Sequence, residues 1–314
     1  MFNKNKEKYQ IRTDVAFEEL DFRKLGFHAK EEIIEEHSVD GLVIRKTYVS
    51  SKTAEEINKK SGMYYLIDTS NIKLNQNLES VEKALIDILK DLFTFLDIDE
   101  SDKGLIVGLG NINITPDSLG PMVIDNILVT RHLFELGEDV EGLSNICAIS
   151  PGVMGQTGME TSDIIKAIIK EKSIDYLIVI DSLASRSVKR VCNTIQVTSA
   201  GISPGSGIGS SRKELSKEVL KIPVIAIGVP TVVDAVTIVS DTLEKASKHF
   251  KNYPASPLKH FDELSDRDKR ILFEEILGDA NFMVTPKEID AEIEDLSRII
   301  STSLDKSLHH IINE

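Results

Sequence analysis

Three short apolar runs predict buried, parallel strands. Each run is brief, rich in β-branched side chains and closed by Gly, Asp or Pro, which is typical of strands covered on both faces. Helix-like stretches alternate with the runs, and this alternation predicts an α/β fold: an open, mostly parallel sheet with helices on both faces. The runs cover residues 104–108, 176–180 and 224–228, and the helix-like stretches cover about 122–137, 161–171 and 211–220.

A different pattern near residues 40–75 predicts a small additional β-containing insertion within the same domain. Residues 42–49 and 63–68 resemble strands, and the Lys-rich stretch 51–60 between them is helix-like. Residues 79–96 then place Val81, Leu85, Ile88, Leu89 and Leu92 on one face, which predicts an amphipathic helix.

The C-terminal segment carries a strong helix pattern. Thr285 is expected as the N-cap, with Pro286 at the first helical position and Glu288 completing a capping box. A stripe of apolar residues follows at three- and four-residue spacing, and we expect it to pack in the core: Ile289, Ile293, Leu296, Ile300, Leu304, Leu308 and Ile311.

Composition narrows the classes of protein that this chain can be. Its 314 residues carry 37 Lys and Arg against 51 Asp and Glu, a net charge of −14, which argues against nucleic-acid binding through a basic face. No uncharged apolar run reaches the roughly 18 residues of a membrane span. Two cysteines are too few for a disulfide framework, so we expect the protein to reside in a reducing cytoplasm.

The charge is unevenly distributed along the chain. Residues 1–14 hold four cationic side chains and two anionic ones, a net of +2, so the remaining 300 residues carry −16. A short basic arm of this kind is either a solvated tail or a segment that docks electrostatically on its own acidic body.

Two aspartates follow predicted strands, where ligands bind in open α/β sheets. Asp117 lies in the Gly- and Pro-punctuated loop 108–121, and Asp181 directly follows the run 176–180. Two such carboxylates can divide acid and base roles on one water, or they can ligate a divalent metal. Alternatively, Asp117 caps the next helix and Asp181 accepts hydrogen bonds from loop amides.

Two Gly-rich loops could also contribute to a site. The segment 201–212 contains Gly205, Gly207 and Gly209, but it lacks the Lys-Ser/Thr ending of a P-loop and does not fit the dinucleotide fingerprint. A flexible substrate-contacting loop or lid is therefore favoured over a phosphate cradle. The same interpretation applies to residues 150–161.

Other catalytic patterns are missing from the sequence. The seven histidines are scattered without an H-E-x-x-H pair, and there is no G-x-S-x-G elbow. Neither Cys147 nor Cys192 is flanked by a nucleophile signature, so burial is expected for both. We assign no metal ligand and no cofactor from the sequence, and whether a divalent metal takes part stays open.

Several stretches of the chain resemble one known protein family. The chain resembles the germination protease family of spore-forming bacteria, endopeptidases that degrade small acid-soluble spore proteins. The matching stretches run in one order along nearly the whole chain, whereas 247–282 carries little of the resemblance. They are residues 12–18, 108–121, 151–160, 181–187, 192–196, 201–212, 224–239 and 285–290.

The resemblance implies a self-cleaving zymogen. Family substrates are cut after an acidic residue in a Thr/Ser-Glu-(Phe/Ile)-Ala-like context, which Thr13-Asp14-Val15-Ala16 matches. The processing bond is therefore expected between Asp14 and Val15, leaving a propeptide of residues 1–14 and a single α/β peptidase domain of residues 15–314. This bond coincides with the boundary between the basic arm and the acidic body.

The family also assigns its active site to two aspartates, which fall here on Asp117 and Asp181. It resembles hydrogenase-maturation peptidases, with a phosphorylase/hydrolase-like fold, and those enzymes bind metal, which leaves a divalent metal open here. Arg186 is a candidate for orienting a carboxylate or binding the acidic residue before the scissile bond. The family implies small acid-soluble spore proteins as substrates, a homotetramer and a location in the forespore or spore core.

Two alternatives belong to other classes of protein. One is a nucleotide- or phosphate-binding module that uses the loop 205–209. The other is a metal-dependent maturation peptidase that acts on a folded precursor, and the substrate-like site at residues 13–16 argues against it.

Overall fold

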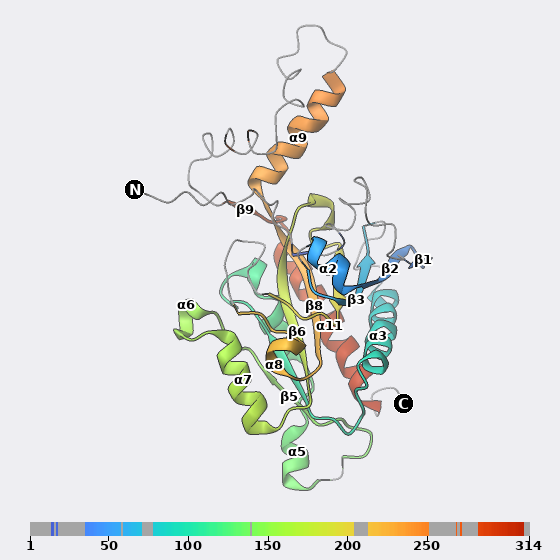
Figure 1. Ribbon diagram of the computed structural model, residues 1–314, viewed down its shortest axis with the longest axis vertical. Helices are drawn as coiled ribbons and strands as arrows, with labels where there is room; N and C mark the ends of the chain where they lie inside the picture. The colour runs from blue at the N-terminus through green and yellow to red at the C-terminus, as the bar shows by residue number, and fades with distance from the viewer. Residues whose placement is uncertain are drawn as a thin grey trace.

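The computed structural model contains one open sheet flanked by helices (Figure 1). Its strands follow the order β1-β2-β3-β7-β8-β6-β4-β5, and β9 pairs with β8. The description that follows covers residues 14, 15, 17, 35–57, 59–70, 78–138, 140–203, 213–250, 268, 271 and 282–310.

The parallel part of the sheet contains the three predicted strands. β4 (Gly104–Gly108) lies between β5 (Ile146–Ile149) and β6 (Tyr176–Ser185), and β6 also pairs with β8 (Val224–Asp234). β6 and β8 extend beyond their apolar runs because they continue to pair with each other after β4 has ended. The predicted α/β class is confirmed.

The antiparallel part of the sheet includes the predicted insertion. β1 (Glu35–Val39), β2 (Leu42–Val49) and β3 (Gly62–Asp68) form a meander, with α2 (Ser51–Ile57) connecting β2 to β3. β3 pairs with β7 (Thr194–Thr198), which pairs with β8. The described strands of this region, within residues 35–68, are therefore continuous with the main sheet.

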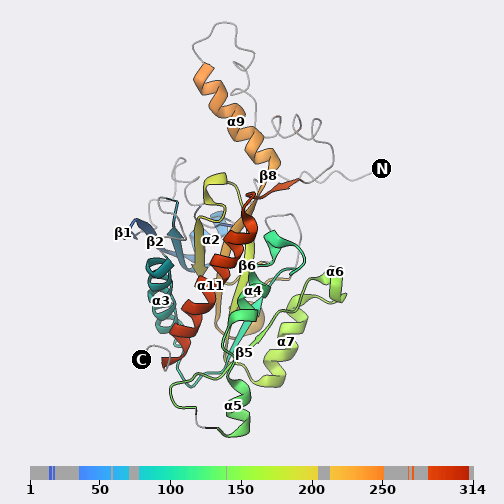
Figure 2. The ribbon, with the colours of Figure 1, turned by 180° about the vertical axis from the view of Figure 1, so that it is seen from behind.

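Helices cover both faces of the sheet, as predicted (Figure 2). α3 (Leu78–Phe95), α4 (Leu119–Asn126) and α11 (Ile289–Leu308) pack on one face in the largest apolar cluster. α7 (Thr161–Lys172) and α8 (Lys217–Leu220) contribute to the cluster on the other face. The predicted C-terminal stripe lies in the core, with residues 289–308 of it buried and Ile311 outside the described residues.

Two predicted helices are shorter than expected. The stretch 122–137 divides into α4 and α5 (Arg131–Leu136), because the amide of Thr130 donates to the carbonyl of Ile146 at 3.0 Å and so ties the break to β5. α8 begins at Lys217 rather than near 211, because Leu215 exchanges backbone hydrogen bonds with Ile202.

The predicted cap of the C-terminal helix was also wrong. α11 begins at Ile289 with Glu288 at its N-cap position. The hydroxyl of Thr285 instead donates to the carbonyl of Thr231 at 2.8 Å, so it fastens the preceding segment to β8.

The remaining long helix, α9 (Ala235–Phe250), continues from β8 and extends away from the sheet (Figure 1). β9 (Met283–Val284) returns beside the end of β8. Among the helices that the structure describes, none combines the length and apolar composition needed to cross a bilayer.

Candidate active site

Asp181 lies inside β6, one residue beyond the last pair that β6 forms with β4. β6 therefore does not end at Asp181, as the sequence had suggested, but continues to Ser185 beside β8. The residue is 7% exposed. Because side chains alternate along a strand, Asp181 shares the face of β6 that carries Val179 and Leu183.

Asp117 lies in a short 3₁₀ turn, η2 (Thr115–Asp117), that adjoins both β6 and β8. The loop before it is fastened by two backbone hydrogen bonds: Leu109 N donates to Ile180 O at 2.8 Å, and Asn111 N donates to Asp117 O at 2.9 Å. Asp117 is half-buried. Ser118, not Asp117, occupies the N-cap position of α4, so the helix-cap alternative does not describe this residue.

Gly110 makes this loop conformation accessible. Its φ of +117° is one that L side chains rarely adopt, and a Cβ there would lie 2.0 Å from the backbone oxygen of Asp117 and 3.3 Å from its Cγ. The position of Asp117 thus depends on the absence of a side chain at residue 110.

Both predicted aspartates therefore lie just beyond the carboxyl end of β4, and α/β sheets bind ligands at such strand ends. The elements that carry them, η2 and β6, are in contact. Asp181 is buried and Asp117 is half-buried, and carboxyl groups in such different environments can take separate acid and base roles. Within the described ranges, no group of three or more His, Cys, Asp or Glu side chains is placed to hold a metal ion.

The loop 150–161 approaches this edge. It contains α6 (Met154–Thr157), where Gln156 Nε2 donates to Asn111 Oδ1 at 2.8 Å and so joins the loop that carries Asp117. The carboxylate of Glu160 accepts from the amide of Lys213 at 3.0 Å, next to the end of the second Gly-rich loop. Gly205, Gly207 and Gly209 themselves lie outside the described residues.

Arg186 directly follows β6 and is half-buried. Its place in the chain, five residues after Asp181, keeps it a candidate for contacts near the end of β6. Its contribution to substrate binding remains a prediction.

The structure adds a contact that the sequence did not reveal. The amide of Asp14 donates to Ala184 O at 3.0 Å, and the amide of Ala184 donates to Asp14 Oδ2 at 3.0 Å. Val15 and Phe17 are both 0% exposed. The segment expected to contain the processing bond is thus fastened to the strand that carries Asp181.

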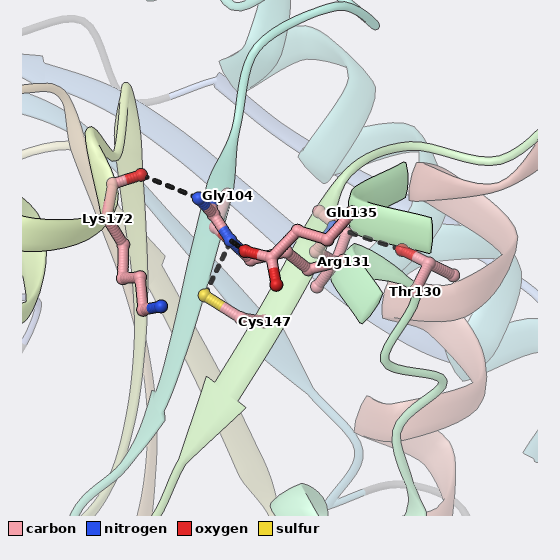
Figure 3. A network of polar contacts seen from close by, with 7 residues as sticks. Gly104, Thr130, Arg131, Glu135, Cys147 and Lys172 are labelled. Carbon is pink, nitrogen blue, oxygen red and sulfur yellow. Dashed lines mark hydrogen bonds and ion pairs between the residues drawn. The ribbon is translucent and has the colours of Figure 1, made fainter. Parts of the chain in front are cut away.

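Neither cysteine is suited to act as a nucleophile. Burial raises the pKa of the Cys192 thiol to about 12, and burial also raises the pKa of Cys147. Figure 3 shows Cys147 at the amino end of β4, where its thiol lies 3.6 Å from Gly104 O, near the Arg131–Glu135 ion pair. That is the opposite end of β4 from the loop of Asp117, and both thiols stay protonated at neutral pH.

Comparison with known proteins gives this site its context. The sequence model of the germination protease family, Peptidase_A25, matches residues 18–256 and 255–314. The chain belongs to the germination protease family. It is therefore a peptidase, as the resemblance of its motifs predicted.

Two germination proteases illustrate the similarity. The protein of Bacillus thuringiensis subsp. konkukian (strain 97-27) is 42% identical, with 98% of this chain and 96% of the relative covered. The germination protease of Bacillus cereus (strain 03BB102) is 41% identical over the same shares of the two chains.

A solved structure also shows a limited likeness. The NiFe hydrogenase maturation protease HycI from Thermococcus kodakarensis KOD1 matches 69% of this chain and 98% of its own, at 15% identity and a TM-score of 0.32. A score this low supports no inference about the reaction.

Proposed function

We propose that this germination protease is an endopeptidase made as a self-cleaving zymogen. It would begin the degradation of small acid-soluble spore proteins during germination by cutting after an acidic residue. Asp117 and Asp181 would activate the attacking water. The observation that carries the proposal is the attachment of Asp14, in a substrate-like sequence, to the strand that contains Asp181.

The processing bond and Asp181 would lie along one strand. Ala184, which binds Asp14, is three residues from Asp181, or about 10 Å of strand. Asp117 approaches the same strand through η2. The backbone amide and the carboxylate of Asp14 are both hydrogen-bonded to Ala184, which limits the freedom of the bond that follows Asp14.

The reaction would need two proton transfers. The water oxygen forms a bond to the carbonyl carbon of Asp14 while one aspartate accepts the water proton. The bond to the nitrogen of Val15 then breaks as the other carboxyl group donates a proton to that nitrogen. The products are a chain ending at Asp14 and a new amino terminus at Val15, and no cofactor is needed to balance the step.

The remaining expectations belong to the same proposal. The basic arm would lie across the acidic body and block substrate entry, although residues 1–13 lie outside the described part of the chain. The enzyme would act as a homotetramer in the forespore or spore core, without binding nucleic acid or membrane. Arg186 and the loop of Gly205, Gly207 and Gly209 would contact substrate.

Two matched peptides test the reaction. One contains Thr-Glu-Ile-Ala and the other Thr-Gln-Ile-Ala, so they differ only in the charge before the scissile bond. We expect the self-cleaved enzyme to cut the first between Glu and Ile and to leave the second intact. Cleavage of both peptides at equal rates, or of neither, would refute the proposed specificity.

Single variants test the two aspartates. Asp117→Asn and Asp181→Asn should each reduce self-cleavage by at least about 100-fold while leaving the thermal unfolding curve in place. Asp125→Asn is the matched control, because Asp125 is an exposed carboxylate on the neighbouring helix α4. Complete processing of either active-site variant would remove that residue from the mechanism.

A further inference from the structure

An apolar cluster surrounds the residues that follow Asp14. Val15 and Phe17 pack in one cluster with residues from β2, α2, β3, β6 and the segment after β7. Every cluster member is buried. We call the six residues that come from the body of the protein the anchor cluster: Val49, Ala54, Tyr64, Leu66, Leu183 and Ala200.

Hydrogen bonds and close packing hold residues of the anchor cluster in place. The hydroxyl of Tyr64 donates to the carbonyl of Lys60 at 2.8 Å, which fixes its ring beside the end of α2. Leu183 lies against Gly228, where an added Cβ would come within 2.4 Å of the Leu183 side chain. Neighbouring side chains and β8 therefore hold the cluster in place.

The anchor cluster is also aligned with the candidate catalytic residues. Leu183 is two residues from Asp181 and so projects from the same face of β6. The next residue, Ala184, binds Asp14 through both its amide and its carbonyl. One stretch of β6 thus carries a candidate catalytic carboxylate, an apolar contact and a backbone binding site.

This arrangement is how a strand recognises an extended peptide. Main-chain hydrogen bonds hold the peptide, and contacts with its side chains supply specificity. The main-chain contacts here hold the acidic residue, and the apolar contacts receive the residues that follow it. A charged side chain at the position of Val15 would lose its hydration among apolar groups, so the cluster discriminates against it.

We infer that the anchor cluster is the subsite that selects the apolar residue directly after the scissile bond in protein substrates. This inference rests on the proposed function. Val15 occupies the subsite in the uncleaved chain, so the same contacts that orient the processing bond also exclude other proteins. After cleavage, Val15 and Phe17 leave the subsite before a substrate residue enters it.

A rescue experiment in the full chain tests whether Val15 packs in the anchor cluster. Val15→Trp should slow self-cleavage by about 10-fold, because an indole is larger than the valine that the cluster holds and larger than the Phe or Ile of family substrates. Val49→Ala enlarges the cluster, and combined with Val15→Trp it should restore most of the lost rate. Independent, multiplicative effects of the two changes would show that the residues are not coupled and would overturn the assignment.

Peptides test the substrate side. The series Ser-Glu-X-Ala, with X as Ala, Val, Phe or Lys, is offered to the self-cleaved enzyme. We expect kcat/KM with X as Val to exceed that with Ala by about 10-fold, and Lys to be the poorest. Ala54→Leu, which fills the cluster from α2, should reduce the preference for Val over Ala by at least about 5-fold.

The control and the outcomes separate this inference from the proposed function. Leu136→Ala changes an exposed apolar residue on α5, 73% exposed, and should leave the preference unchanged. Thermal unfolding confirms that each variant is folded. If the wild type cleaves no peptide, the proposed function fails. If it cleaves all four at the same rate, or Ala54→Leu keeps the wild-type preference, the anchor cluster is not the subsite.

Discussion

At the scale of single residues, the backbone conformation of Gly110 determines where Asp117 lies. Its positive φ allows the loop after β4 to turn back on η2, where Asn111 binds the carbonyl of Asp117. A methyl group at residue 110 would meet that same carbonyl oxygen at 2.0 Å. Either the loop or the aspartate would have to move.

Gly110→Ala should therefore lower both stability and activity. We expect the free energy of unfolding to fall by about 2 kcal/mol, from backbone strain and the displaced contact. Self-cleavage should slow more than 10-fold, because a small misplacement of a catalytic group is costly. Urea denaturation and a time course of processing measure the two effects.

Gly155→Ala provides the matched control. Gly155 lies in α6, and an added Cβ there would meet no atom within 4 Å. Its stability should be unchanged or slightly higher, because Ala favours helix. Wild-type stability and processing in Gly110→Ala would contradict the role given to this turn.

Asp117 and Asp181 could be predicted from the sequence because polar residues after buried apolar runs indicate strand ends. Ala184 could not be predicted, because it contributes its backbone amide and carbonyl, groups that every non-proline residue possesses. The contact also joins residues 170 positions apart. No periodic pattern within one chain segment encodes such a pairing.

At the scale of elements, the end of α11 is tied to the body by buried polar groups. His309 is 0% exposed; Ser144 N donates to its Nδ1 at 3.2 Å, and its Nε2 lies 3.3 Å from Leu128 O. Asp305 on the same helix accepts from Leu128 N at 3.0 Å. These contacts require a neutral imidazole with its proton on Nε2.

Acidification should weaken this attachment. Burial lowers the pKa of His309 below its ordinary 6.5, so the unfolded chain takes up a proton more readily than the folded one. Its contribution to stability is therefore complete above pH ~6.5 and declines as the pH falls toward the depressed pKa of the folded state. Thermal unfolding between pH ~7.5 and ~5.5 should show this decline.

His309→Gln isolates the contribution of the histidine. Burial raises the pKa of nearby Asp305, which favours its protonated form and so acts in the opposite direction. Asp305 remains in the variant, so the difference between the two pH profiles reports His309 alone. The variant should lose less stability on acidification, and identical slopes would contradict the attachment described here.

Elements that bury many apolar side chains were predicted well from the apolar pattern of the sequence. β4, α3 and α7 were predicted within a residue or two, because each is long enough or apolar enough to specify its own type. The predictions failed at boundaries that tertiary hydrogen bonds set: Thr130 divides a predicted helix, and Thr285 binds β8 instead of capping α11.

At the scale of the whole molecule, one sheet contains both the predicted parallel strands and the strands of the predicted insertion. The meander β1–β3 joins the parallel strands through β7, and β7 was not predicted. The junction is where the anchor cluster forms, since its residues come from the meander side and from β6.

The net charge of −14 is unevenly divided between the proposed propeptide and the rest of the chain. It divides into +2 for residues 1–14 and −16 for the rest, at the bond that we propose is cut. Asp14 and Val15, on either side of that bond, are both held against the body. Removal of the arm would therefore leave a more acidic enzyme.

Amino-terminal sequencing and intact mass of the purified chain, incubated at mildly acid pH, test the central claim most directly. The account predicts a single cut that removes residues 1–14, a new amino terminus at Val15, and no such product from Asp181→Asn. A chain that keeps Met1 throughout, or that is cut at another bond, would contradict it.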